Sequence, residues 1–170
     1  VIDTVAAENF QNWSVCSGLD NAKGRDAECS IAFKYGMKRD FNAWLKTLGD
    51  KAPVKTLTEL RQWNIAHQRA EAIKYGQANL DVSDEMDLEK DKTRWEADRA
   101  KDIRLGGTSG IDAVMKTQTL DAILFPGASG AGIAAKPGYP TVIVPFAMVP
   151  NAPTPAFPEG FEAKPIPYGV

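Results

Sequence analysis

A short loop rich in glycine, alanine and serine holds the residues whose types and spacing come closest to catalytic and binding motifs. Residues 127–131 read Gly-Ala-Ser-Gly-Ala, which nearly matches the G-x-S-x-G nucleophile elbow. The last position is alanine, and the single histidine, His67, is not placed as a triad partner would be. We therefore expect Ser129 to be a loop hydroxyl, and we assign no catalytic residue within the chain.

The same loop also resembles a dinucleotide-binding fingerprint. Residues 130–135 read Gly-Ala-Gly-Ile-Ala-Ala, which has the letters of G-x-G-x-x-A. That motif must open a full helix within a βαβ unit, where the helix N-terminus binds the pyrophosphate. Because Pro137-Gly138 would cut such a helix to a turn, we expect no nicotinamide or flavin site and assign no other cofactor.

The cysteines and the histidine are too few to bind a structural metal. Two cysteines and one histidine do not supply the four ligands of an ordinary zinc site, so we predict no metal centre. Cys16 and Cys29 allow one pairing, either a disulfide in an exported protein or two unpaired thiols. His67 follows Trp63 by one helical turn, and we expect it to be packed or at the surface.

Composition bounds the class of protein. With 170 residues, 44% of them hydrophobic and 25% charged, the chain is expected to form ordinary globular structure. A net charge of −2 leaves no electrostatic footprint for nucleic acid, and no apolar run approaches the roughly 20 residues of a membrane-spanning helix. We expect a soluble protein, with the compartment, cytoplasmic or exported, left open.

Helical periodicity is clearest in the first half of the chain. Residues 27–48 carry an apolar stripe at spacings of three and four, which predicts a helix with a buried face; the stripe is Phe33, Met37, Phe41, Trp44 and Leu48. Thr56 and Glu59 form a capping box, which predicts a second helix from there to about Gly76. Residues 1–5 are a short β-rich run.

The second half alternates charged, glycine-rich and proline-rich segments. Residues 81–105 are dense in charge and predict a solvated helix, or part of an oligomer contact that would fit a homodimer. Gly106-Gly107 predicts a break, followed by a short helix near Ile111. Residues 150–167 are rich in proline, which removes amide donors and predicts an extended surface loop.

Two β-branched apolar runs flank the small-residue loop and predict buried strands at residues 123–125 and 141–144. The order strand, Phe125-Pro126-Gly127, small-residue loop, Gly138-Tyr139-Pro140-Thr141, strand, Val144-Pro145 resembles the C-terminal part of the amidase-signature family. The resemblance covers about residues 1–149. It implies an α/β fold, with a mixed sheet covered by helices and completed by residues outside this chain.

The resemblance also implies a function. Amidase-signature enzymes hydrolyse carboxylic amides with a Ser-cisSer-Lys triad. This chain has no segment that matches the triad. We therefore expect the triad to lie upstream of this chain, and we expect the isolated chain to be inactive. This chain would be the C-terminal portion of a single amidase-like domain. Its partners would be a small-molecule amide and the N-terminal catalytic half, and its substrate-binding residues would be Gly127, Ala128, Ser129, Gly130 and Ile133.

Two other interpretations remain open from the sequence. The chain could be a self-contained binding module whose small-residue loop holds a ligand without chemistry. It could also be a structural partner subunit. The glycines of the loop could equally serve only to permit a tight turn.

Overall fold

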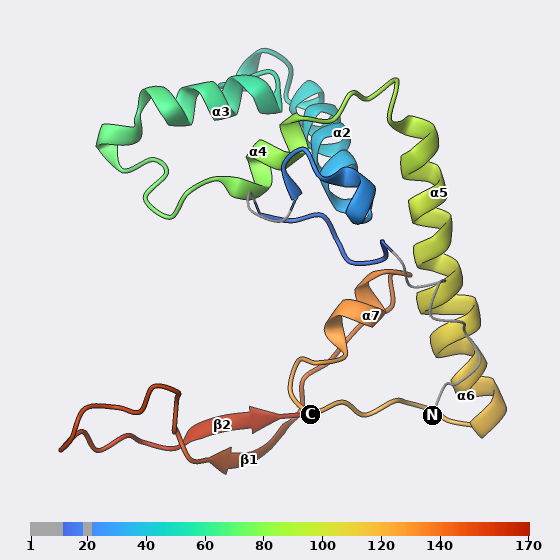
Figure 1. The fold of residues 1–170 in the computed structure, drawn as a ribbon, viewed down its shortest axis with the longest axis vertical. Coiled ribbons are helices and arrows are strands. Elements are labelled where there is room, and N and C mark those ends of the chain that lie inside the picture. The colour runs from blue at the N-terminus through green and yellow to red at the C-terminus, as the bar shows by residue number, and fades with distance from the viewer. Residues whose placement is uncertain (1–11, 19–21) are drawn as a thin grey trace. The chain divides into compact units, whose positions relative to one another are not determined.

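A computed structural model describes residues 12–18 and 22–170, so the β-rich run at residues 1–5 lies outside the described residues. The chain divides into two compact units, Val1–Lys101 and Asp102–Val170, each described separately below. The first unit contains η2 (Asp26–Glu28), α2 (Ala32–Thr47), η3 (Gly49–Lys51), α3 (Leu57–Ala66), η4 (Gln68–Ala70), α4 (Ala78–Asp84) and α5 (Lys92–Asp102), whose last residue belongs to the second unit. The second contains the π-helical segment η5 (Ile103–Ile111), α6 (Asp112–Gln118), α7 (Ala131–Ala135), β1 (Pro145–Val149) and β2 (Ile166–Gly169) (Figure 1).

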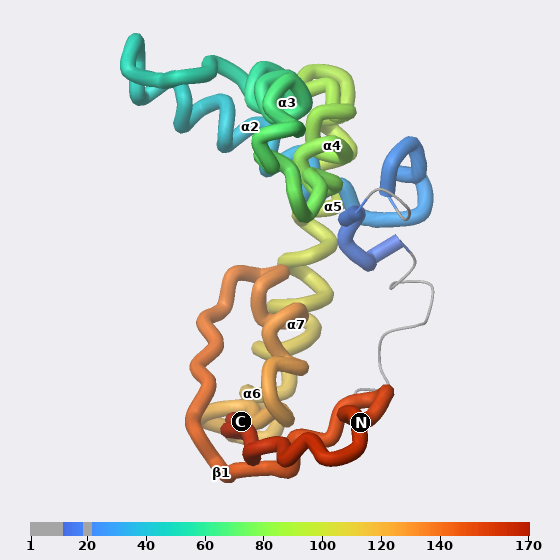
Figure 2. The backbone as a smooth tube through the Cα atoms, turned by 90° about the vertical axis from the view of Figure 1, so that its left-hand side faces the viewer, coloured from blue at the N-terminus to red at the C-terminus, as the bar shows by residue number. Residues whose placement is uncertain are grey.

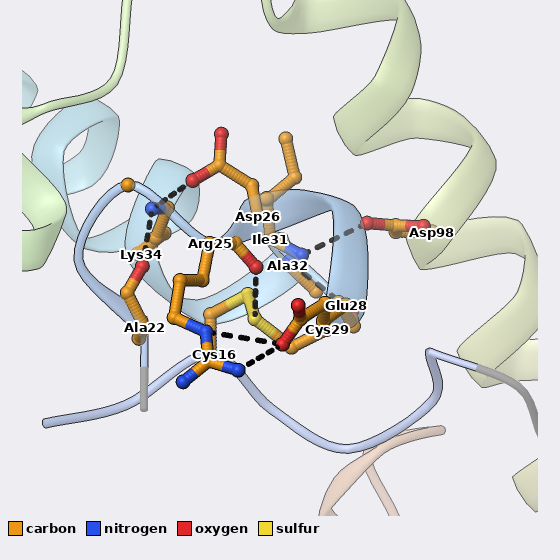
Figure 3. Close-up of a disulfide and its surroundings, with 12 residues drawn as sticks. Cys16, Ala22, Arg25, Asp26, Glu28, Cys29, Ile31, Ala32, Lys34 and Asp98 are labelled. Carbon is orange, nitrogen blue, oxygen red and sulfur yellow. Dashed lines mark hydrogen bonds and ion pairs between the residues drawn. A yellow bond between two sulfur atoms is a disulfide. The ribbon is translucent and has the colours of Figure 1, made fainter. Parts of the chain in front are cut away.

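A disulfide lies at the centre of the first unit. Cys16 and Cys29 are bonded to each other, which resolves the alternative of two free thiols, and both are buried (Figure 3). They share one hydrophobic cluster with Tyr35 of α2, Val82 of α4 and three residues of the adjoining segments, namely Ala22, Ile31 and Met86. The segment before α2 is thus fixed to the helices by a covalent bond and by apolar packing.

A fully buried lysine ties the same segment to α2. The Nζ of Lys34 lies 2.6 Å from a carboxylate oxygen of Asp26 and 3.4 Å from one of Glu85 on the chain that follows α4. It also donates to the Ala22 carbonyl at 3.3 Å (Figure 3). Because a buried charge is tolerated only when it is paired and hydrogen-bonded, these three partners explain how α2 turns a lysine inward.

The buried face of α2 differs from the predicted stripe. Phe33 and Trp44 are exposed, whereas Tyr35 and Leu45 are buried together with Lys34. The face toward α4 carries polar side chains with specific partners: Lys38 donates to the carbonyls of Asp84 and Met86, each at 2.8 Å. A search for an apolar stripe does not find this face of α2, because several of the side chains that it buries are polar.

The predicted capping box of the second helix is confirmed at its first bond. The Thr56 hydroxyl accepts from the backbone N–H of Glu59 at 3.1 Å. The Glu59 carboxylate reaches back one residue further than the motif requires and accepts from the N–H of Lys55 at 2.7 Å. The helix itself is shorter than predicted, since α3 ends at Ala66.

In the second unit the predicted break at Gly106-Gly107 is wrong. The helical backbone continues from α5 through η5 into α6, with the two glycines inside the π-helical segment. Both glycines are buried, and Pro137 packs against them, so tertiary contact compensates for the low helix propensity of glycine.

The strand positions also differ from the prediction. Residues 123–125 and 141–144 are not assigned to a strand; β1 begins at Pro145 and pairs antiparallel with β2. Val144 and Val170 exchange two backbone hydrogen bonds, of 2.8 and 3.0 Å, at the end of this pairing. Figures 1 and 2 show extended chain leading from α7 to β1. Residues 141–144 have the composition of a strand, but among the described residues they are not assigned to a strand ladder.

The described residues are therefore mainly helical with one small two-stranded sheet, which is compatible with an α/β fold. Residues 150–165 between the strands form neither helix nor strand and are mostly exposed. Among the described residues, no helix has the length and apolarity needed to cross a membrane.

Asp84 joins three helices of the first unit. Its carboxylate accepts from the Thr58 hydroxyl and from the Arg61 guanidinium, both of α3 and each at 2.6 Å. Lys38 of α2 lies 3.4 Å from the same carboxylate. Burial alone would raise the pKa of Asp84, but the hydrogen bonds from Thr58 and Arg61 and the nearby cations outweigh it, so the pKa lies below its usual 3.8.

This lowered pKa predicts an acid-sensitive stability. The carboxylate stabilises the fold above its unfolded pKa, and the contribution is lost as pH falls through the lower folded pKa. We expect Asp84→Asn to lower the free energy of unfolding by about 1–3 kcal/mol at neutral pH, with the difference shrinking below about pH 4. Urea unfolding across a pH series measures this. Asp50→Asn, at an exposed position of η3, is the matched control; a difference for Asp84→Asn that does not change with pH contradicts the prediction.

Candidate functional site

The small-residue loop folds as consecutive turns that lead into α7. The N–H of Ser129 donates to the Pro126 carbonyl at 3.2 Å, and that of Ala131 to the Ala128 carbonyl at 3.1 Å. α7 then runs for only five residues. The prediction that Pro137-Gly138 cuts this helix short is confirmed, and α7 is too short to be the helix that a dinucleotide fingerprint opens.

The five predicted substrate-binding residues lie on this one turn and helix, with different exposure. Ala128 and Ser129 are exposed, Gly127 and Ile133 are half-buried, and Gly130 is buried. Of the five predicted residues, Ala128 and Ser129 are therefore the ones that a ligand could reach most easily, beside the exposed Ala131 and Gly132. Which of the five residues contact a substrate remains a prediction.

Two glycines of the loop are required by contacts within the chain. A Cβ at Gly130 would overlap the ring of Phe125, so this position admits no side chain unless the ring moves. Gly127 has a φ of +53°, which disfavours other residues, and its N–H donates to the Gly169 carbonyl beside β2 at 3.0 Å. The loop is thus held against Phe125 and the C-terminal strand.

α7 and the residues after it pack on the π-helical segment. A Cβ at Gly106 would lie 2.8 Å from Cδ of Pro137 and 3.2 Å from the Ile133 carbonyl oxygen, and one at Gly107 would lie 3.2 Å from Cβ of Pro137. A side chain at Gly106 would force Pro137 to shift, and one at Gly107 would be a tight fit. π-helical turns within helices are frequent at functional sites, so this packing is of interest beyond stability.

Residues 136–139, Lys-Pro-Gly-Tyr, are bonded to both ends of η5, and we call them the clasp. The Nζ of Lys136 donates to Asp102 at 2.8 Å, and both side chains are largely buried. The Tyr139 hydroxyl donates to the Asp112 carboxylate. This hydrogen bond, with burial and the charge of Asp112, raises the pKa of Tyr139 above its usual 10.0.

The chemistry available within the second unit is limited. Ser129 offers a hydroxyl, but residues 102–170 contain no histidine, and Lys136 is engaged in its ion pair with Asp102. In the first unit His67 stacks on Trp63 with ring centroids 3.9 Å apart, and its Nδ1 lies 2.8 Å from the Trp63 carbonyl oxygen. The arrangement on the loop is suited to binding and shape selection, without an assembled nucleophile and base.

The clasp was missed by the sequence analysis. Asp102 lies in the charged stretch that predicted a solvated helix, yet it is buried. Lys136 was not predicted as a site residue, because a single lysine before Pro137 belongs to no periodic pattern and to no motif. The available signal was Pro137-Gly138 itself, which fixes where α7 ends and hence where its neighbours lie.

Comparison with known proteins gives one informative similarity. The chain is 26% identical over 148 residues to a protein of Arabidopsis thaliana named "probable amidase". The similarity covers 86% of this chain but 26% of that protein, so the chain spans about a quarter of the relative's length. No protein-family model and no solved structure matches the chain. The similarity points to an amidase-related protein.

The contact between Gly130 and Phe125 predicts different effects for two neighbouring glycines. Gly130→Ala should destabilise the protein by about 1–3 kcal/mol, because the Phe125 ring must leave its place. Gly132→Ala is the matched control, since no atom lies within 4 Å of its added Cβ and alanine favours the helix by up to about 1 kcal/mol. Thermal unfolding of both variants tests this; equal effects of the two substitutions contradict the assignment.

Proposed function

We propose that this chain is part of an amide hydrolase, which converts a carboxylic amide and water to an acid and an amine or ammonia. The observation that carries the proposal is the similarity to a protein named an amidase over 86% of the chain. So little of the chain lies outside the aligned stretch that residues 126–138 fall within it wherever it begins.

The catalytic groups in this proposal lie outside the chain. A Ser-cisSer-Lys triad upstream would supply the nucleophile and the base, because a lysine shielded from water can accept a proton through a bridging serine. The nucleophilic serine would add to the amide carbonyl and release the amine, which leaves an acyl-enzyme. Water would then hydrolyse the acyl-enzyme and release the acid. The second unit would contribute sheet and substrate-pocket wall within an amidase-signature fold.

Exposed apolar side chains of the second unit support the proposal that catalytic groups and pocket wall come from different parts of the protein. Seven large apolar residues of the second unit are more than half exposed: Leu124, Val142, Ile143, Val144, Phe146, Met148 and Phe161. Large apolar side chains gain free energy when another protein removes them from water, and exposed ones often mark such a contact surface. In the proposal this surface is covered by the N-terminal catalytic half.

Residues 127–133 would line the acyl side of the pocket. Ala128 and Ser129 are exposed and small, so a substrate could approach the backbone closely there. The N–H of Gly127 donates to the carbonyl of Gly169, the last residue of β2, so the loop lies against the end of this strand. The loop would select substrates by the space it leaves.

A larger side chain at Ala128 should therefore change substrate preference. In the full-length protein, Ala128→Leu should reduce kcat/KM for amides with bulky acyl groups about tenfold or more relative to acetamide-sized substrates, mainly through KM. Steady-state kinetics on a graded series of acyl amides measures this ratio. Ala70→Leu, at an exposed position of η4, is the matched control.

Two results would contradict the proposal in different ways. Absence of turnover of every amide by the full-length wild-type protein would favour a binding module or a structural subunit. Turnover with the same preference in wild type and Ala128→Leu would retain the hydrolase and remove the loop from the pocket.

A further inference from the structure

The clasp connects the π-helical segment to the proposed pocket loop. Asp102 and Asp112 immediately flank η5, so the bonds of Lys136 and Tyr139 hold this segment at both of its ends. Between them, Pro137 lies against Gly106 and Gly107, where a Cβ would clash at Gly106 and fit tightly at Gly107. The position of residues 136–139 is therefore fixed by two polar bonds and one close apolar contact.

The hydrogen-bond pattern carries this position through α7 to the loop. The N–H groups of Gly138 and Tyr139 both donate to the Ala134 carbonyl, at 3.2 and 2.9 Å. The N–H of Ala134, whose side chain is buried, donates in turn to the Gly130 carbonyl at 3.2 Å. With Gly127 bonded to Gly169 of β2, the loop is held at both ends, and these bonds connect the clasp to Gly130.

The ion pair between Lys136 and Asp102 is the largely buried polar contact of the clasp. The Lys136 and Asp102 side chains are 13% and 5% exposed, so solvent screens their attraction less than it would at the surface. Removing the ammonium would leave a buried carboxylate without this partner, and such a group is satisfied only by water or by rearrangement. α7 would then lose its fixed distance from η5.

We propose that Lys136 is a positioning residue that sets acyl-group selectivity through the clasp. It holds α7 so that residues 127–130 form a wall of fixed depth against the acyl group of the substrate. This inference rests on the proposed amide hydrolase function, because it assigns a selectivity role to the same loop. Lys136 itself takes no part in bond making or breaking.

The experiment uses the full-length protein with Lys136→Met, and with Lys116→Met on α6 as the matched control. Hydrogen exchange of the peptide covering residues 126–135 reports on the loop without reference to activity. Kinetics on small and bulky acyl amides report on selectivity. Lys136→Met should raise exchange in this peptide about tenfold and reduce the selectivity ratio about tenfold through KM, while kcat for the small amide stays within a few-fold. Lys136→Arg should restore both, because arginine can also pair with Asp102.

A milder variant keeps the test decisive if Lys136→Met does not fold. Tyr139→Phe removes only the hydroxyl that binds Asp112, and it should produce the same two changes to a smaller extent. Unchanged loop exchange in a folded Lys136→Met protein, or increased exchange with unchanged selectivity, overturns the positioning role. Absence of amide turnover by the wild-type protein is a separate result, which overturns the proposed function and the role that rests on it.

Discussion

The close packing of Pro137 against Gly106 and Gly107 is the constraint on which the second unit depends. A Cβ at Gly106 would come within 2.8 Å of the proline ring, so the segment after α7 lies this close to the π-helical segment because Gly106 has no side chain. Once it lies there, Lys136 and Tyr139 reach the acidic residues at either end of η5. The shape of the small-residue loop follows from this arrangement, together with the contact of Gly130 with Phe125.

Part of this fold could be predicted from the sequence, where the decisive interaction is local. The Thr56 cap involves residues three apart, and the end of α7 follows from Pro137-Gly138 directly after it. The conformation at Gly106-Gly107 could not be predicted in this way. It depends on Pro137, about thirty residues later, which packs on the two glycines and keeps the backbone helical.

The candidate site shows the same limit. The sequence located the loop and its small residues, but it could not separate glycines needed for internal contacts from residues left accessible. That distinction depends on Phe125 and Gly169, which approach Gly130 and Gly127 only in the folded chain. The clasp could not be predicted from the sequence, because Lys136 and Asp102 are 34 residues apart and belong to no common pattern. In the first unit, Lys34 was overlooked for a related reason, since a buried lysine is stabilised by partners that periodicity does not show.

In the proposed amide hydrolase, residues 12–18 and 22–170 would supply structure and pocket wall, and the nucleophile would lie outside them. The most direct measurement is the site of covalent labelling by a serine-directed phosphonate in the full-length protein, located by peptide mass spectrometry. The account predicts one labelled serine outside this chain, with loss of amide turnover in proportion to labelling. Stoichiometric labelling of Ser129, or of any other residue of this chain, with the same loss of turnover would contradict it.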